Sequence, residues 1–506
     1  MTESKAQSRT SRPWDGGMAM AAALLSGLPG PGVFRDFSWS MLSRAVTIAS
    51  NMVFLAVTAR LFGKEDVALL AVTAILTALM DAAKGLGLGT VLLKRLPKLD
   101  EAGESAGTEA SELVCSYLFY SLLPPAGAAL AVIAAAVPLS QYFFGHVGQA
   151  TGLRLGAVLA LLAVLTNTNQ LVLQAAQRFG QLARSTILSG ALQRLAPCLM
   201  AMVWPGRLEG FLEWSVVFSV VAFAQTLGPV VRMAARSRAR ILGPREFWGE
   251  SGHFYFANLL RYGATQADQL FVAAAFEPAT LAAYYMLRRL YSLAVVVIGA
   301  AIDTLTPGLS RQAASDPEGA RNRLGQYLRV FLFGATVAAA LFAGNGETIV
   351  PVLLGAGYGD DLWLILLFAV SGIVYFLFGF AQLDLVLFEH PKWSFRLGAM
   401  AAVGNAIASA GLALVLGARG LPLAMALGYL AGIELLRQRR LLAGWEPREL
   451  WIAVSVTALV ALASHAAVET GANGWARALV VNALIAAFAW DHFRRWRIGP
   501  CIRAIL

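Results

Sequence analysis

The sequence predicts an all-α polytopic membrane protein with about fourteen transmembrane helices. Of its 506 residues, 58% are hydrophobic and only 14% are charged, and the mean hydropathy is +0.63. Soluble globular chains are about 45–50% apolar and about 25% charged. Apolar runs of roughly 20 residues, the length that a bilayer requires, recur along the chain. These two observations exclude a large soluble enzyme, a disordered protein and a disulfide scaffold.

The apolar runs divide the chain into four parts. Residues 1–37 form a polar cytoplasmic tail, 38–240 an N-lobe of helices 1–6, and 241–440 a C-lobe of helices 7–12. Residues 441–506 hold helices 13 and 14 and a basic cytoplasmic tail. The predicted spans are centred near residues 50, 78, 126, 164, 195, 222, 264, 292, 338, 373, 404, 428, 459 and 482.

The distribution of Lys and Arg predicts the orientation. With the N-terminus inside, 28 of the 40 cations lie in cytoplasmic segments, and the outer loops hold only Lys64, Arg207, Arg419 and Arg477. By the positive-inside rule both termini are cytoplasmic and the helix number is even. We expect a multi-pass protein of the bacterial inner membrane. The net charge of +10 is spread over short loops that contact membrane lipids, so no nucleic-acid partner is expected.

Eight cations remain within the predicted spans: Arg44, Arg60, Lys84, Arg154, Arg194, Arg261, Arg288 and Arg289. Each costs on the order of 3 kcal/mol or more if it faces lipid at the bilayer centre. Arg60 and Arg154 lie near outer ends, where they can snorkel to the interface. The others require a partner or a hydrated cavity.

Polar residues recur at helical spacing in four spans, which places each set on one helix face. Such stripes predict a shared hydrated cleft, because polar contacts between packed helices explain isolated Ser and Thr but not charged stripes. The cavity is net cationic, and the planar guanidinium group suits phosphate oxygens. An anionic, phosphate-bearing cargo follows. The sets are Ser40, Arg44, Thr47, Asn51 and Thr58; Thr73, Thr77, Asp81 and Lys84; Asn258, Arg261, Thr265 and Asp268; and Tyr284, Arg288 and Ser292.

Spans 1–2 and 7–8 resemble each other, with Arg44 opposite Arg261 and Asn51 opposite Asp268. The offset of six helices gives the two copies the same orientation. A parallel repeat of this kind places a binding site between two six-helix lobes.

Three stretches are similar to polysaccharide flippases of the Wzx type. They are the first two helices with the turn ARLFG and the end GLG, the connection QRFGQLARSTILSGALQR, and the segment with TQADQLFVA that closes on PGLSR. The resemblance covers most of the first 330 residues. It implies the multidrug/oligosaccharidyl-lipid/polysaccharide exporter superfamily, with two six-helix lobes, a central cavity and alternating access.

The resemblance and the cationic cavity together predict a flippase for an undecaprenyl-diphosphate-linked oligosaccharide, used to build surface polysaccharide or exopolysaccharide. Arg44 and Arg261 are expected to bind the diphosphate from the cytoplasmic half, and Arg194 and Arg288 near the midplane. Tyr284 and Tyr291 are expected to stack on sugar rings. Asn51 and Asn258 complete the predicted lining, whereas Arg289, about 100° away from Arg288, is expected to serve helix packing.

The acidic residues leave two readings open. Asp81 and Lys84, at i and i+3, are expected to neutralise each other. Asp268 either couples transport to H⁺ or Na⁺ or holds an arginine. No other cofactor and no metal site are expected, because the three cysteines lie far apart and no metal-ligand spacing occurs.

Other functions remain as alternatives. A lipid II flippase and a cation-coupled multidrug exporter share the implied fold, although the exporter should carry a neutral or acidic pocket. A membrane glycosyltransferase or ligase is less favoured, because the five His are scattered and no large outer loop is present. No GxxxxGK[ST] motif occurs, so no ATPase machinery is expected. Because no catalytic constellation is apparent either, we expect a transporter and not an enzyme. A polysaccharide polymerase and a chain-length regulator are expected partners of the flippase.

Overall fold

The computed structural model describes residues 31–101, 107–204, 207–234, 240–358, 361–388, 391–438, 447–469 and 474–495. Every secondary-structure element in these ranges is helical, and every predicted span centre falls within a helix. Ten helical segments of the described chain are long and apolar enough to cross a membrane. The all-α polytopic prediction is therefore confirmed, whereas the count of fourteen and the parallel repeat stay predictions. Most of the predicted N-terminal tail lies outside the described residues.

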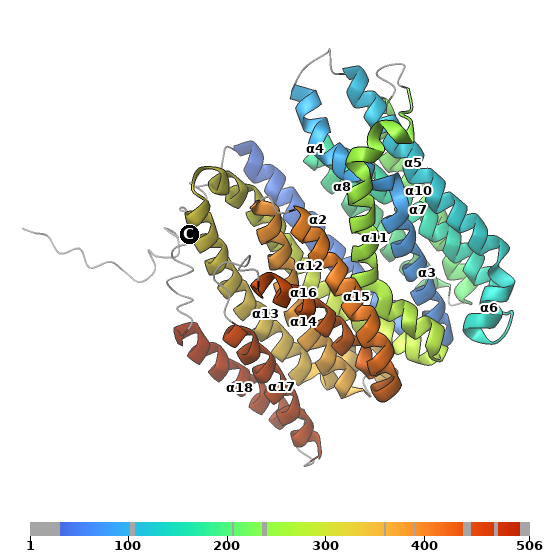
Figure 1. Ribbon diagram of the computed structural model, residues 1–506. Helices are drawn as coiled ribbons and strands as arrows, with labels where there is room; N and C mark the ends of the chain where they lie inside the picture. The colour runs from blue at the N-terminus through green and yellow to red at the C-terminus, as the bar shows by residue number, and fades with distance from the viewer. Residues whose placement is uncertain are drawn as a thin grey trace, which may run out of the picture.

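The first group of helices (Figure 1, blue to green) surrounds α7, which packs against α3, α5 and α10. Several of these helices are interrupted. Its elements are α2 (Pro31–Leu61), α3 (Lys64–Ala83), the 3₁₀ turn η1 (Lys84–Gly87), α4 (Leu88–Glu101), α5 (Gly107–Ala134), α6 (Ala136–Phe144), α7 (Ala150–Ala175), α8 (Phe179–Gly190), the π-helical turn η3 (Ala191–Leu195), α9 (Ala196–Val203) and α10 (Leu208–Ala234).

The second group surrounds α14, which packs against α12, α13 and α16, and α17 and α18 lie against α13 at the edge of the molecule (Figure 1). Its elements are α11 (Pro244–Ala275), α12 (Pro278–Ser315), α13 (Pro317–Leu354), η4 (Ala356–Tyr358), α14 (Leu362–Leu387), α15 (Pro391–Leu416), η5 (Gly417–Arg419), α16 (Gly420–Gln438), α17 (Pro447–Glu469) and α18 (Gly474–Arg495).

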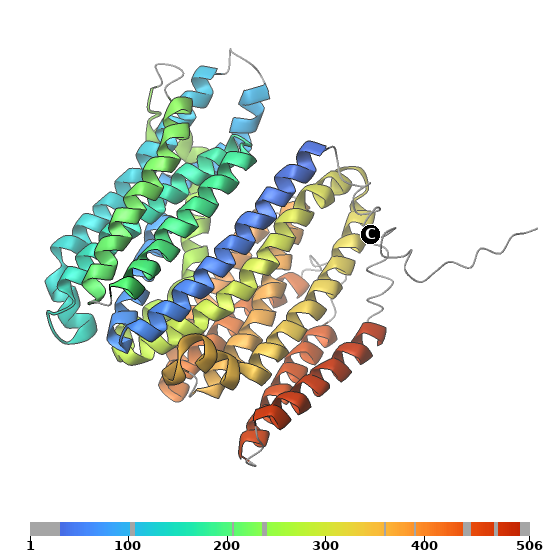
Figure 2. The ribbon, with the colours of Figure 1, turned by 180° about the vertical axis from the view of Figure 1, so that it is seen from behind.

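The two groups meet along α2 and α3 on one side and α11 and α12 on the other, as the view from behind also shows for α2 and α12 (Figure 2). Toward the end of the molecule that holds the α2–α3 turn, one apolar core joins them. This core includes Leu69 and Leu70 of α3 and Leu281 and Leu287 of α12. The predicted outer half of the interface is thus closed by side-chain packing.

Toward the other end, the break between α3 and α4 brings the groups together. Gly85, Leu86 and Gly87 all have positive φ angles, a conformation that glycine adopts without steric cost. A β-carbon on Gly87 would lie 2.2 Å from the backbone oxygen of Ser251 in α11. The glycines therefore permit both the turn and the direct backbone contact with α11.

Candidate functional site

A cavity of about 190 Å³ lies in the first group of helices, and α12 of the second group closes one side of it. Helices α2, α3, α7 and α10 and the π-helical turn η3 supply the rest of its wall. The apolar part of the lining comes from Phe, Leu and Ala side chains. The polar part consists of Asn51, Thr73, Thr77, Gln193, Arg194, Ser215, Ser219, Tyr285, Arg289 and Ser292.

The π-helical turn η3 carries Gln193 and Arg194 into the cavity. Pro197 lies just after this turn and has no N–H to donate to the carbonyl of Gln193, four residues earlier. The N–H of Ala196 instead bonds to the carbonyl of Ala191, five residues back. Such π-bulges are frequent at functional sites because they re-aim side chains. Here the bulge holds Gln193 and Arg194 at the cavity wall.

Helix α12 presents Tyr285, Arg289 and Ser292 to the cavity. These residues are spaced i, i+4 and i+7, so they lie on one helix face. The Nε atom of Arg289 donates a hydrogen bond to the Tyr285 hydroxyl at 3.2 Å, and the guanidinium carbon lies 5.3 Å from the centre of the Tyr285 ring. These contacts hold Arg289 beside the ring.

The cavity is positively charged. Arg194 and Arg289 are close enough to repel each other, and no carboxylate of the described chain lines the cavity or pairs with either of them. Amide and hydroxyl groups surround the two guanidinium groups. An anion placed between the arginines would relieve their repulsion and accept charge-assisted hydrogen bonds from both. The arrangement is suited to a phosphate or diphosphate group.

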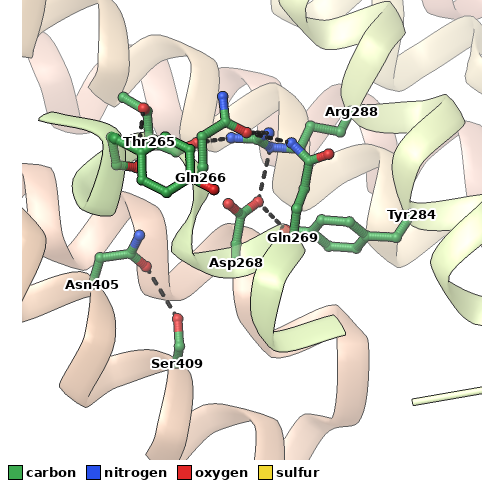
Figure 3. A network of polar contacts seen from close by, with 9 residues as sticks. Thr265, Gln266, Asp268, Gln269, Tyr284, Arg288, Asn405 and Ser409 are labelled. Atoms are coloured by element: carbon green, nitrogen blue, oxygen red, sulfur yellow. Dashed lines mark hydrogen bonds and ion pairs between the residues drawn. The ribbon is translucent and has the colours of Figure 1, made fainter. Parts of the chain in front are cut away.

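A different arrangement surrounds Arg288, on the adjacent face of α12. Its Nε atom forms an ion pair with Asp268 Oδ2 at 2.8 Å, and the Tyr284 hydroxyl donates to the same oxygen at 2.6 Å. Arg288 also donates to Gln266 Oε1 at 3.0 Å and to the Thr265 carbonyl (Figure 3). Asp268 is fully buried and Arg288 is 9% exposed. This network joins α11 to α12 inside the protein.

Several predicted site residues therefore lie apart from the cavity. Tyr284 and Tyr291 are buried and pack on Phe368, with ring centroids 5.1 and 5.8 Å from it, so their rings belong to the core. The predicted stripe of Tyr284, Arg288 and Ser292 is divided between two surroundings, because only Ser292 lines the cavity. At about 100° per residue, Ser292 lies about 20° from Tyr285 but about 80° from Tyr284.

The remaining predicted residues are distributed as follows. Asn51 and Arg194 line the cavity, as expected. Arg44 in α2 and Asn258 in α11 are half-buried and are not among its described lining residues. Arg261 falls in α11, but its side chain lies outside the part of the chain that the structure describes.

The smaller charge pair follows the sequence closely. Lys84 Nζ contacts Asp81 Oδ1 at 2.6 Å, which confirms the contact expected from their i, i+3 spacing. Of the two roles considered for Asp268, the contact with an arginine is present in the structure, while ion coupling stays a prediction. No cluster of potential metal ligands occurs among the described residues.

Gln193, Tyr285 and Arg289 are cavity residues that the sequence did not reveal; Arg289, which was expected to serve helix packing, lies on the cavity wall. Both Arg288 and Arg289 are flanked by tyrosine at i−4, so the local pattern does not separate them. The signal that favours the face of Arg289 is the spacing of Tyr285 and Ser292, which are seven residues and only about 20° apart. For Gln193, the signal is its place four residues before a helical proline.

A family model described as polysaccharide biosynthesis protein matches residues 57–361, more than half of the chain. The chain belongs to this family. The match includes α3 to α12, and thus every element that lines the cavity except α2, whose lining residues Asn51, Phe54 and Leu55 precede it. A search of curated proteins finds no match.

Several solved structures have the same fold as this protein. The lipid II flippase MurJ, in an inward closed conformation, gives a TM-score of 0.67 at 12% identity, over 91% of this chain and 99% of that chain. An inward-facing multidrug resistance MATE family transporter of the MOP superfamily gives 0.60 at 15% identity, over 79% and 94%. A MOP superfamily transporter from Pyrococcus furiosus, described as having a binding pocket of reverse polarity, gives 0.56 at 14% identity, over 80% and 94%.

Proposed function

We propose that this protein is a flippase that moves an undecaprenyl-diphosphate-linked oligosaccharide across the bacterial inner membrane by alternating access. The observation that carries the proposal is the cavity with Arg194 and Arg289 and no described carboxylate. An unpaired diphosphate is very costly in hydrocarbon, and each sugar hydroxyl adds several kcal/mol. Two arginines and a wall of amides and hydroxyls give such a headgroup a polar path.

The proposal assigns a role to each part of the cavity. Arg194 and Arg289 bind the diphosphate between them. Asn51 and Gln193 contact sugar hydroxyls, and Tyr285 holds Arg289 in place through its hydroxyl. Alternating access exposes the cavity when the contact of Gly87 with α11 opens. H⁺ or Na⁺ coupling and contacts with a polymerase and a chain-length regulator belong to the same proposal.

Two alternatives share the fold. A lipid II flippase would carry the same diphosphate, so the cavity charge suits it equally; the polysaccharide biosynthesis family favours the oligosaccharide cargo. A multidrug exporter for organic cations would require acidic groups, and none occurs among the described residues of the cavity wall.

The proposal is tested by mass spectrometry of polyprenyl-linked lipids in a strain that lacks the gene. We expect one diphosphate-linked oligosaccharide to accumulate, and wild-type protein to relieve the accumulation. Arg194→Ala and Arg289→Ala should not relieve it. Arg154→Ala is the matched control, because Arg154 is an exposed arginine of α7 outside the cavity. Accumulation of lipid II would favour the first alternative, and an unchanged lipid profile with altered dye sensitivity would favour the exporter.

A further inference from the structure

A second hollow, which we term the outer groove, lies at the end of α2 beside α9 and the start of α10. It measures about 350 Å³. Its wall is apolar and aromatic, and its single charge is positive. It is lined by Leu61, Phe62, Met200, Ala201, Trp204, Arg207, Gly210, Phe211 and Trp214.

The outer groove opens on the side of the protein where lipid is expected. Trp204 is 72% exposed and Trp214 is 41% exposed. Tryptophan favours the membrane interface, where its ring is buried and its N–H reaches polar groups. Arg207 belongs to a predicted outer loop. Together these residues place the outer groove at the level of the outer leaflet.

One side chain is shared by the outer groove and the cationic cavity. Phe211 lines both hollows and is 5% exposed. Its ring centroid lies 5.1 Å from that of Phe62 in the outer groove and 6.2 Å from that of Phe54 in the cavity. Phe211 therefore contacts both a polar, cationic space and an apolar, aromatic groove.

We infer that the outer groove binds the polyprenyl chain of the lipid whose diphosphate occupies the cavity, with Phe211 as the partition between chain and headgroup. The inference rests on the proposed function. Continuity with the cavity favours this occupant, because an amphiphile with a diphosphate at one end matches a cationic cavity that leads into an apolar groove. The positive charge of Arg207 complements a phosphate-bearing lipid and disfavours a cationic amphiphile.

A glycine permits a direct test. A β-carbon on Gly210 would meet no other atom within 4 Å, so Gly210→Trp fills the outer groove without displacing the backbone. Gly228, also in α10, has the same free space but does not line the outer groove, so Gly228→Trp is the matched control. The full-length protein is placed in lipid nanodiscs with a polyprenyl diphosphate that carries a diazirine on its chain. Saturable binding and the positions of the photoadducts are both measured.

We expect adducts within residues 200–214 that excess undecaprenyl diphosphate removes and excess phosphatidylglycerol does not. Gly210→Trp should lower their yield by roughly fivefold or more, with Gly228→Trp unchanged, because the bulky ring takes the place of the chain. Adducts that persist in Gly210→Trp, or that phosphatidylglycerol removes equally well, would overturn the outer-groove assignment alone. Probe binding that does not depend on Arg194 and Arg289 would overturn the proposed function as well.

Discussion

Arg288 and Arg289 are neighbours in α12, yet they belong to two regions with opposite electrostatic designs. Arg288 lies in a buried network where Asp268 neutralises it and the Tyr284 hydroxyl donates to the same carboxylate oxygen. Arg289 lies on the cavity wall with Arg194 and has only a tyrosine hydroxyl as a described partner. The first region holds α11 to α12, and the second keeps its charge available. The groups around an intramembrane arginine, and not its residue type, thus indicate whether it stabilises the fold or is available to bind a ligand.

The largest expected effect tests the buried network. Asp268→Asn preserves shape but leaves the buried Arg288 without an anion, and breaking a buried pair in this way costs about 3–5 kcal/mol. We expect a clear loss of thermal stability of the purified protein in detergent. Arg288→Met in the Asp268→Asn background should restore part of it. Equal stability of Asp268→Asn and wild type would mean that the network does not hold the two helices together.

The cavity arginines should show the opposite behaviour. Arg194→Ala or Arg289→Ala removes charge-assisted hydrogen bonds worth about 1.5–3 kcal/mol each, so binding of a polyprenyl diphosphate should weaken roughly tenfold to a hundredfold. Thermal stability should change little, because no described carboxylate loses its partner. Binding is measured by titration of the nanodisc-embedded protein, with Arg154→Ala as the control. Strong destabilisation by Arg289→Ala with unchanged binding would remove the distinction between the two regions.

The two tyrosines allow the same comparison with a smaller change. Tyr284→Phe deletes the hydroxyl that donates to buried Asp268, which should cost about 1–3 kcal/mol of unfolding free energy. Tyr285→Phe deletes a hydroxyl that accepts a hydrogen bond from Arg289 but leaves no buried carboxylate without a donor, so it should cost less, about 0.5–1.5 kcal/mol. Parallel thermal denaturation of the two variants measures the difference. If Tyr285→Phe is the more destabilising variant, the assignment of the two faces of α12 is reversed.

The fold could be predicted from the sequence because each membrane helix is recognisable from its own stretch of residues. Each apolar run must satisfy its own backbone hydrogen bonds, so length and hydropathy alone predict where a helix lies. Every predicted span centre accordingly falls within a helix. The Asp81–Lys84 contact could be predicted for the same reason, because it depends on a local spacing of three residues at the end of α3.

The site could be predicted from the sequence only in part. The sequence predicted a cationic cavity with Asn51 and Arg194 in its wall, and both line it. It placed Tyr284 and Arg288 there instead of Tyr285 and Arg289, because helical periodicity defines relative faces but not which face meets which neighbour. A rotation of about 100° separates the two choices. Only the packing of α12 against α11 and α14 on one side, and against α2 and α3 on the other, settles it.

The sequence by itself determined the all-α membrane architecture, the excess of intramembrane cations and the resemblance to the family. Composition and local spacing carry this information, because the bilayer imposes the same requirement on every span. Only the packed structure shows which arginine is neutralised, which residues share the cavity with Arg194, and that Phe211 lines two hollows. These features depend on side chains that are distant in sequence, and only packing brings them within contact distance.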